Sequence, residues 1–368
     1  MTWQQVVMVG LSLVLMWLSI VKKYEPLLLL PIAFGMMIAN IPLAGLGAHD
    51  EGGLIYYLYQ GIKLGIYPPM IFLCIGAMTD FGPLISSPKS ALIGIGGQLG
   101  IFAAFVGALF LGNALAAVIP GFEGFTVQEA AAVGMIGSSD GPTSIYTAET
   151  LAPSLLPTIA IAAYSYMALV PLIQPPIMRA LTTKKERMIQ MPPAKQVSKR
   201  ARIIFPIAIT LGVLVLVPAA GPLVGMLMLG NLIRESGVTD RLARMLQNDL
   251  LNLLTLLIGL SVGATATAAQ VLNIKTVFVI LLGLFAFGMG TVGGMLMAKL
   301  LCRLSGGKLN PLIGNSGVSA MPMAARVSQK LGQEYNPGNH LLMHAMGPIV
   351  SSTVGSALLA GIFIAILG

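Results

Sequence analysis

The chain has 368 residues, of which 56% are hydrophobic and only 9% are charged, with a formal net charge of +8 and a mean hydropathy of +0.87. Soluble domains carry about 25% charged residues. So few charges cannot cover a molecule of this size with polar surface, which excludes a soluble globular protein and indicates an integral membrane protein. The long apolar runs lack the alternation of barrel strands, which excludes an outer-membrane β-barrel.

Ten apolar segments approach the roughly 20 residues that a helix needs to cross a bilayer. The first has no upstream basic region and no small-residue cleavage site, so we expect a retained helix and not a signal peptide. The sequence therefore predicts an all-α polytopic membrane protein. The predicted spans are 3–21, 25–43, 66–86, 90–119, 155–180, 203–219, 221–234, 250–270, 275–303 and 340–367.

Two further segments, 127–146 and 311–326, are partly apolar but short and rich in Gly, Ser, Asn and Pro. Irregular backbone survives at membrane depth only where it is buried in protein or lines a cavity. We therefore expect both segments to be re-entrant and broken.

Lysine and arginine side chains predict the orientation of the chain, because cytoplasmic loops of membrane proteins are enriched in them. Lys22 and Lys23 follow the first span, which places the N-terminus outside, and residues 49–51 then also fall outside. The basic stretch 179–202 falls inside and is read as a topogenic loop, an interpretation that also allows an acidic soluble partner to dock there. Its lack of aromatic residues argues against nucleic acid.

The two broken segments resemble each other. Ile136-Gly137-x-Ser139 aligns with Ile313-Gly314-x-Ser316 at an offset of 177, and the same offset aligns Pro171 with Pro348. The predicted topology makes one segment enter from outside and the other from inside, which is an inverted repeat of the kind that builds many secondary transporters. The predicted division is 1–65 for N-terminal helices and scaffold, 66–182 for the first repeat, 183–202 for the basic loop, 203–249 for connecting helices and 250–368 for the second repeat.

The sequence contains no familiar metal, thiol or nucleotide motif. Its two cysteines, Cys74 and Cys302, lie 228 positions apart in apolar runs, so we expect neither a disulfide framework nor a metal site from them. Neither HExxH nor GxxxxGK[ST] occurs, so the chain offers no ATP site of its own.

Asp140 lies in the first broken segment, "GMIGSSDGPTSIY". An ionised carboxylate in the bilayer interior costs several kcal/mol unless it is paired, protonated or bound to a cation. Gly141-Pro142 breaks the helix and frees backbone carbonyls, and hard oxygen donors of this kind suit Na⁺, Li⁺ or a proton. The alternative is a helix N-cap, and the two roles can coexist. The neighbouring hydroxyl groups belong to Ser138, Ser139, Thr143 and Ser144.

The second broken segment supplies Asn315, Ser316 and Ser319 but no acid, and it ends near Arg326. Arg326 is either a snorkelling interface residue or an anion site for a carboxylate that arrives from the cytoplasm. In the following span of the first repeat, Tyr166 lies too deep for an interfacial belt residue and needs a polar partner.

Three motifs together resemble the beta subunits of the sodium-pumping, biotin-dependent decarboxylases, a family with oxaloacetate, methylmalonyl-CoA, glutaconyl-CoA and malonate members. They are "GMIGSSDGPTSIYTAETLAP", "NPLIGNSGVSAMPMAARVSQK" and "NPGNHLLMHAMGPIVSSTVGSALLAG". The resemblance implies an enzyme and translocase of the cytoplasmic (inner) membrane. It would remove CO₂ from carboxybiotin carried by a partner subunit, drive Na⁺ out of the cytoplasm and consume a proton. The short chain favours an acyl-CoA system.

The resemblance also implies roles for single residues. Asp140, Tyr166 and Arg326 would be catalytic, and Arg326 and Asn310 would bind carboxybiotin. The Na⁺ ligands would be Asp140, Ser319, Asn315 and Ser139, and Gly314 matches a further position of the family motif.

The implied partners are a biotin carrier subunit, a carboxyltransferase alpha subunit, a small single-span gamma or delta subunit and further copies of this chain. By analogy with inverted-repeat carriers, we expect an elevator-like or rocking shift of 127–180 and 311–367 against a scaffold. Two alternatives remain open from the residues alone. One is a secondary Na⁺-coupled carboxylate transporter without a biotin partner, and the other is a membrane anchor, which leaves Asp140 unexplained.

The topology makes a direct prediction. A cysteine introduced in place of Gln190 in the basic stretch should resist an impermeant thiol reagent added to intact cells, because the loop faces the cytoplasm. Rapid labelling at this position would reverse the orientation of the whole chain. Labelling after permeabilisation is the control for access.

Overall fold

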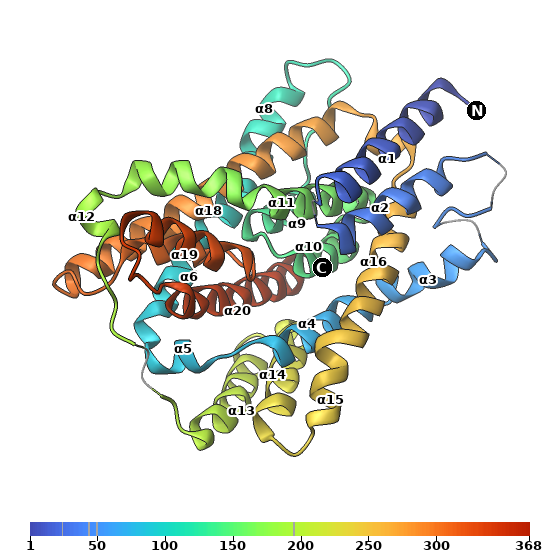
Figure 1. Ribbon diagram of the computed structural model, residues 1–368. Helices are drawn as coiled ribbons and strands as arrows, with labels where there is room; N and C mark the ends of the chain where they lie inside the picture. The colour runs from blue at the N-terminus through green and yellow to red at the C-terminus, as the bar shows by residue number, and fades with distance from the viewer. Residues whose placement is uncertain (24, 43–44, 49–50, 194–195) are drawn as a thin grey trace.

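The computed structural model describes residues 1–23, 25–42, 45–48, 51–193 and 196–368 (Figure 1). Within these ranges the chain is helical throughout and contains no strand, which confirms the all-α prediction. Residues 49 and 50 of the predicted outside residues 49–51, and residues 194 and 195 of the basic stretch, lie outside the described residues.

One set of helices, the arc helices, runs down one side of the molecule and beneath the rest (Figure 1). Within it α2 packs against α1 and α16, and α4 packs against α14. The arc helices are α1 (Trp3–Val21), α2 (Pro26–Ala39), α3 (Leu54–Lys63), α4 (Tyr67–Met78), α13 (Lys199–Leu216), α14 (Gly221–Ser236), α15 (Asp240–Met245) and α16 (Leu251–Thr265).

The other set, the central helices, is built around α18 (Ile274–Leu304), which packs against α6, α7, α11 and both broken segments. Short helices α12 (Lys184–Arg187) and α17 (Ala268–Val271) connect the parts. The remaining central helices are α5 (Gly82–Ser86), α6 (Ala91–Gly97), α7 (Leu99–Val106), α8 (Asn113–Ala116), α9 (Val127–Gly134), α10 (Gly141–Leu151), α11 (Leu156–Leu181), α19 (Met323–Tyr335) and α20 (Leu342–Leu367).

The ten predicted spans are not all present as full-length helices. Among the described residues, five helical stretches are long and apolar enough to cross a membrane: Trp3–Val21, Pro88–Ala116, Asp240–Thr265, Ile274–Leu304 and Leu342–Leu367. Two bent pairs raise the number to seven, α3 with α4 at 68° and the two halves of α11 at 62°. The predicted span 25–43 is reduced to α2, whose 14 residues rise only about 21 Å. Apolar composition alone did not distinguish such short helices from complete spans.

Two helix crossings among the arc helices share the same kinds of contact. A Cβ added at Gly76 of α4 would lie 1.8 Å from the Leu227 carbonyl oxygen of α14, and one at Gly35 of α2 would lie 2.3 Å from the Leu260 carbonyl of α16. Glycine at these positions lets the backbones touch, which is how helices associate in membranes. Each crossing also carries one buried asparagine. Asn231 donates to the Thr79 carbonyl at the end of α4, and Asn40 donates to the Ala266 carbonyl at the end of α16, both at 2.8 Å.

Glycines also bring the two broken segments against the central helices. A Cβ at Gly137 would lie 2.2 Å from the Gly100 carbonyl oxygen of α7, and one at Gly97 would lie 1.7 Å from the Gly317 carbonyl oxygen. On the other side, a Cβ at Gly294 of α18 would lie 2.3 Å from the Gly314 carbonyl oxygen. Both irregular segments are therefore enclosed by protein at their breaks, as the burial of non-helical backbone in a membrane requires.

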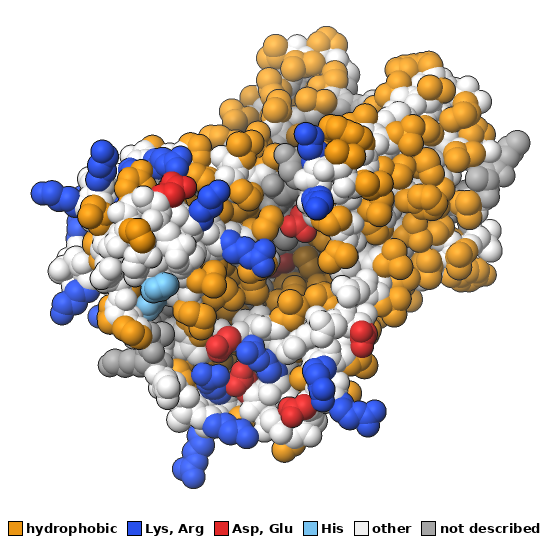
Figure 2. Space-filling view, in the orientation of Figure 1, with side chains coloured by type: hydrophobic (Ala, Val, Ile, Leu, Met, Phe, Trp, Pro, Cys, Tyr) orange, Lys and Arg blue, Asp and Glu red, His pale blue; other side chains and the backbone are white. Residues whose placement is uncertain are grey.

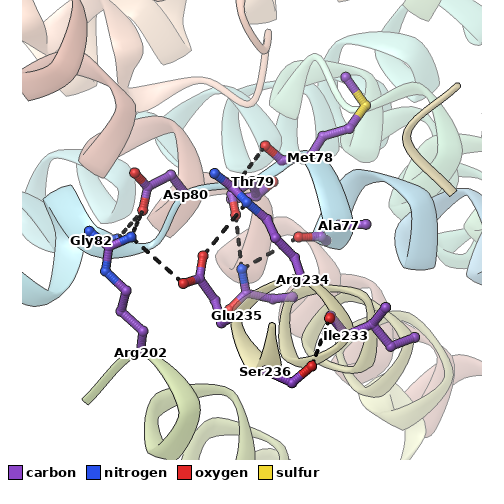
Figure 3. Close-up of polar contacts among 12 residues, drawn as sticks. Ala77, Met78, Thr79, Asp80, Gly82, Arg202, Ile233, Arg234, Glu235 and Ser236 are labelled. Atoms are coloured by element: carbon purple, nitrogen blue, oxygen red, sulfur yellow. Dashed lines mark hydrogen bonds and ion pairs between the residues drawn. The ribbon is translucent and has the colours of Figure 1, made fainter. Parts of the chain in front are cut away.

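The peptide that leaves α4 and leads into the central helices is anchored by side chains of α13 and α14 (Figure 3) and by Gln247 of the π-helical stretch Leu246–Leu250 before α16. Gln247 and Arg234 donate to the carbonyls of Ala77 and Met78 at 2.7 and 3.1 Å. Arg202 lies 3.6 Å from Glu235 and 3.9 Å from Asp80. Side-chain donors thus satisfy helix-end carbonyls that would otherwise lack partners.

The predicted basic stretch is not a uniformly solvated surface. Arg187 is buried and donates to the Arg179 and Thr182 carbonyls and to the Tyr335 hydroxyl, with its guanidinium 4.8 Å from the centre of the Tyr335 ring. Arg179 pairs with Glu334 of α19 at 2.8 Å. These two arginines therefore hold the end of α11 against α19. Of the other described lysines and arginines of the stretch, Arg202 is half-buried and the rest are exposed.

The crossing of α4 and α14 allows a matched stability test within one helix. Gly230→Ala should lower the unfolding midpoint of the detergent-solubilised protein, because the new Cβ would lie 1.9 Å from the Leu73 carbonyl oxygen, and overpacking of this kind costs about 1–3 kcal/mol. Gly225→Ala, in the same helix with nothing within 4 Å of the added atom, should be neutral or slightly stabilising. Equal effects of the two variants would contradict the close crossing.

Candidate functional site

A cavity of about 230 Å³ lies between the arc helices and the central helices. Figure 2 shows the molecule hollowed between the two sets, with basic and acidic side chains along the hollow. The arc supplies an apolar wall from α2, α4 and α16, together with Glu25, Asn252 and Thr255. The central helices supply the opposite wall, which carries most of the polar groups and consists of Ser139, Asp140, Gly141, Pro142, Tyr164, Ser319, Met321, Pro322 and Thr353.

Asp140 occupies the break in the first segment. The helix ends at Ser138, Ser139 adopts a left-handed conformation with φ of 57°, and α10 begins at Gly141. The Asp140 carboxylate accepts a hydrogen bond from the Thr143 backbone N–H at 3.4 Å and one from the Ser356 hydroxyl at 2.7 Å. Asp140 therefore caps α10, which confirms the capping role, and it also lines the cavity. Its role in binding a cation stays a prediction.

The Asp140 carboxylate has no basic partner within 4 Å among the described residues, although only 5% of the residue is exposed. A buried carboxylate of this kind requires a proton or a bound cation. No group of three or more His, Cys, Asp or Glu side chains that could hold a metal occurs in the described part of the chain. Hydroxyls around a single carboxylate suit an alkali cation, not a transition metal.

The second broken segment meets the first at this point. The Ser319 backbone N–H donates to the Ser138 carbonyl at 2.9 Å, and the Ser319 hydroxyl donates to that of Ser352 at 3.1 Å. This segment is a 3₁₀ helix over Pro311–Gly317, is not helical over 318–322, and continues as α19 from Met323. Both segments are thus broken, as predicted, and the structure brings Ser319 into the cavity with Asp140.

Two hydroxyl groups that line the cavity have no hydrogen-bond partner among the described residues. They are the Ser139 hydroxyl and the Tyr164 phenol, both buried. The Tyr164 ring lies so close to Gly141 that a Cβ there would be 2.3 Å from a ring carbon, which explains the glycine after Asp140. A buried polar atom without a partner costs about 1–3 kcal/mol. These two oxygens are therefore available to a ligand of the cavity.

Tyr166, the tyrosine singled out from the sequence, points elsewhere. Its hydroxyl donates to the Ile280 carbonyl of α18, and its ring lies against Gly283. Tyr164 takes the place beside Asp140 instead. Residues two apart on a helix point about 200° apart, so only one of the two can face the cavity. The sequence signal for Tyr164 was its presence in the same "AAYSYMALVP" stretch.

Asn315 and Asn310 are engaged in holding the second segment. Asn315 donates to Gln174 and to the Ala324 carbonyl, both at 2.8 Å, and its own carbonyl oxygen accepts from Ser328. Asn310 donates to the Ile189 carbonyl at 2.8 Å and accepts from the Leu312 N–H. The structure places neither side chain in the cavity with Asp140.

Arg326 lies one turn into α19, with its backbone N–H bonded to the carbonyl of Pro322 at the cavity wall. Its side chain is exposed and forms no hydrogen bond or ion pair with the described residues. The guanidinium is therefore free to receive an anion beside the cavity.

Glu25 was not identified from the sequence as a site residue. It precedes α2 with a left-handed φ of 39°, makes no capping hydrogen bond and lines the cavity. Burial raises the pKa of its carboxyl, and the positive charge of Arg326 partly opposes this rise. A strained backbone that directs a carboxylate into a cavity is typical of a functional position. The signal in the sequence was an acid directly before the Pro26 that starts a short apolar helix.

Taken together, the fold and the site define a multi-pass helical membrane protein with a buried, unpaired carboxylate where two broken helices meet. The family model described as "Na+-transporting oxaloacetate decarboxylase beta subunit" matches residues 4–367, and the chain belongs to this family. It is accordingly a decarboxylase subunit with a role in sodium transport.

Three curated relatives show the range of the family. The methylmalonyl-CoA decarboxylase subunit beta of Propionigenium modestum is 51% identical over 385 residues, covering 99% of this chain and 95% of the relative. The glutaconyl-CoA decarboxylase subunit beta of Acidaminococcus fermentans is 50% identical over 367 residues, with 100% and 94% covered. The oxaloacetate decarboxylase beta chain 2 of Salmonella typhi is 48% identical over 414 residues, with 98% and 94% covered.

Proposed function

We propose that this subunit decarboxylates carboxybiotin presented by a partner and couples that step to Na⁺ export from the cytoplasm, with consumption of a proton. The observation that carries the proposal is the cavity in which Asp140 lies beside unpartnered hydroxyls and without a basic partner. Arg326, whose guanidinium is free, lies one helix turn after Pro322 of the cavity wall. A cation site and an anion site thus adjoin each other. Charges that lie close together act on each other directly, so the binding of the substrate can change the binding of the transported cation.

The carboxylate of carboxybiotin is proposed to bind Arg326, because a guanidinium matches a carboxylate with two parallel hydrogen bonds. Glu25 faces the same cavity from the arc helices and feels the charge of Arg326. Glu25 forms no ion pair with Arg326, but the charge of Arg326 acts on its carboxyl over a longer distance. A substrate carboxylate bound at Arg326 is proposed to change this interaction and so to link substrate arrival to the interface between the arc and central helices.

Na⁺ is proposed to bind at Asp140 together with the Ser139 hydroxyl and Ser319, as expected from the sequence. We add the Tyr164 phenol oxygen to this set, since it is buried, unpartnered and in the same cavity. Asn315 contributes by holding the second broken segment in place, because its side-chain atoms are already hydrogen-bonded. Moving one charge outward against about 100 mV costs about 2.3 kcal/mol.

Decarboxylation breaks the bond between the ureido nitrogen and the carboxyl carbon. The electron pair of that bond stays on the nitrogen, CO₂ leaves, and the nitrogen takes up one proton. Asp140 becomes a stronger base once Na⁺ departs, and it is proposed to carry this proton. Tyr166 is proposed to be catalytic only on the basis of the family motif. In this conformation its hydroxyl fixes α11 to α18.

The proposed complex contains a biotin carrier, a carboxyltransferase alpha subunit, a small single-span gamma or delta subunit and further copies of this chain, in the cytoplasmic membrane. The proposed movement is an elevator-like shift of the central helices along the arc. The two glycine–asparagine crossings of α2 with α16 and of α4 with α14 support an inverted repeat in the arc. The identities of 50–52% to acyl-CoA decarboxylase subunits, against 46–48% to oxaloacetate members, favour an acyl-CoA substrate for the complex.

Asp140→Asn should abolish both Na⁺-dependent decarboxylation and Na⁺ export, because it keeps the capping oxygen and the shape but removes the charge that binds the cation. The measurement is the decarboxylation rate of the assembled complex against Na⁺ concentration. Asp249→Asn, which neutralises an exposed carboxylate, is the matched control and should behave as wild type.

Tyr164→Phe gives a graded version of the same test. Loss of one neutral ligand should raise the Na⁺ concentration for half-maximal activity by about tenfold with little change in the maximal rate.

Wild-type Na⁺ activation in Asp140→Asn would mean that Asp140 is only a helix cap. Carboxylate uptake by the chain without a biotinylated subunit would favour the secondary transporter instead.

Arg326→Lys should reduce decarboxylation of free carboxybiotin by at least about tenfold, because a point charge replaces a two-pronged donor. Na⁺ binding, measured separately by ²²Na⁺ retention, should persist. Arg241→Lys, at an exposed arginine of α15, is the control. Unchanged turnover in Arg326→Lys would make Arg326 a snorkelling interface residue.

A further inference from the structure

A second cavity, of about 550 Å³, lies apart from the Asp140 site and shares no lining residue with it. It is bounded by the start of α6, the end of α18, the start of α20 and residues 191–193 of the basic stretch. Its floor is apolar and includes Leu301, Leu309 and Ile313. We refer to it as the lysine cavity because of the two side chains at its rim.

The charge that lines the lysine cavity is positive. Lys89 and Lys308 stand at its rim, His344 lies in its wall, and none of its lining residues is an acid. Both lysines are exposed, and neither forms an ion pair or hydrogen bond with the described residues. The Ser87 hydroxyl lines the same rim and is exposed. The cavity therefore offers two unused cations and a hydroxyl donor to an anion.

The position of the lysine cavity relative to the membrane follows from the helices that form it. Three candidate spans have an end there, since one begins at Pro88, one ends at Leu304 and one begins at Leu342. Where spans end, the bilayer interior gives way to the head-group region. On the span side of the cavity, Leu92 and Leu304 are 41% and 74% exposed. The cavity thus has a cationic rim and an apolar lip at the membrane boundary.

We propose that the lysine cavity binds the phosphate head group of an anionic phospholipid, with the acyl chains running over Leu92 and Leu304. Lysine ammonium groups bind phosphate as point charges, and basic pockets between membrane helices on the cytoplasmic side bind anionic lipid head groups. The volume suits a head group and not a folded partner, since ligand pockets occupy about 300–1,000 Å³. The apolar lip distinguishes a lipid from free phosphate, because only a lipid gains by covering exposed leucines.

The test uses the full chain, purified with the subunits that accompany it and reconstituted in phosphatidylcholine nanodiscs with or without phosphatidylglycerol. Bound lipid is counted by native mass spectrometry during a titration with phosphatidylglycerol. The Lys89→Gln/Lys308→Gln double variant should weaken phosphatidylglycerol retention by about 30-fold, equivalent to about 2 kcal/mol. Lys184→Gln/Lys185→Gln, an exposed pair in α12 that does not line the cavity, is the matched control and should retain the lipid.

Each other outcome has a definite meaning. Equal retention in the two double variants would overturn the proposal, because any basic surface would then suffice. Displacement of phosphatidylglycerol by inorganic phosphate at similar concentration would identify a free-phosphate site. Loss of a co-purifying subunit with unchanged lipid retention in the Lys89→Gln/Lys308→Gln variant would identify a protein docking site instead. Leu304→Asn should weaken phosphatidylglycerol without affecting phosphate, which tests the contribution of the acyl chains.

Discussion

The rest of the structure depends on the burial of one carboxylate. Asp140 is almost fully enclosed in an apolar protein, and no described basic side chain neutralises it. Such a group is tolerable only with a proton or a cation, so its surroundings must supply donors and ligands that a continuous helix cannot. The break after Ser138 provides them. It turns the Thr143 N–H toward the carboxylate and leaves the Ser139 hydroxyl free at the cavity wall.

A broken helix in turn needs tight packing, because its free backbone groups must not face lipid. This need explains the glycine contacts of Gly137 with Gly100 and of Gly314 with Gly294. It also explains why the second broken segment lies against the first, with the Ser319 N–H on the Ser138 carbonyl. The buried carboxylate, the close glycine contacts and the paired breaks are therefore connected through a single electrostatic problem.

The cavity lies where two sets of helices face each other, and the chain crosses between them through the peptide after α4. That peptide is held by Arg202, Arg234 and Asn231, which attach it to α13 and α14. Glu25 reaches the cavity from the arc, and Arg326 lies beside it on the central helices. The arc helices and the central helices are proposed to move against each other. A carboxylate that binds Arg326 would change its electrostatic interaction with Glu25, and with it the contact between the two sets of helices. The lysine cavity lies elsewhere, at the ends of three spans, and shares no lining residue with the Asp140 cavity.

The sequence by itself determined that the chain is a helical membrane protein, that segments 127–146 and 311–326 are broken, and that Asp140 lies at the first break. Composition and the Gly141-Pro142 step are local properties of the sequence, so their effect does not depend on how the rest of the chain folds. Tertiary structure alone decided which oxygens share the cavity. Tyr164 faces Asp140 while Tyr166 faces α18, Asn315 turns toward Gln174, and Glu25 arrives from a helix more than 100 residues away in sequence. The reason is geometric: a helix fixes the angle between its side chains, but only its packing against other helices fixes which of them points at the site.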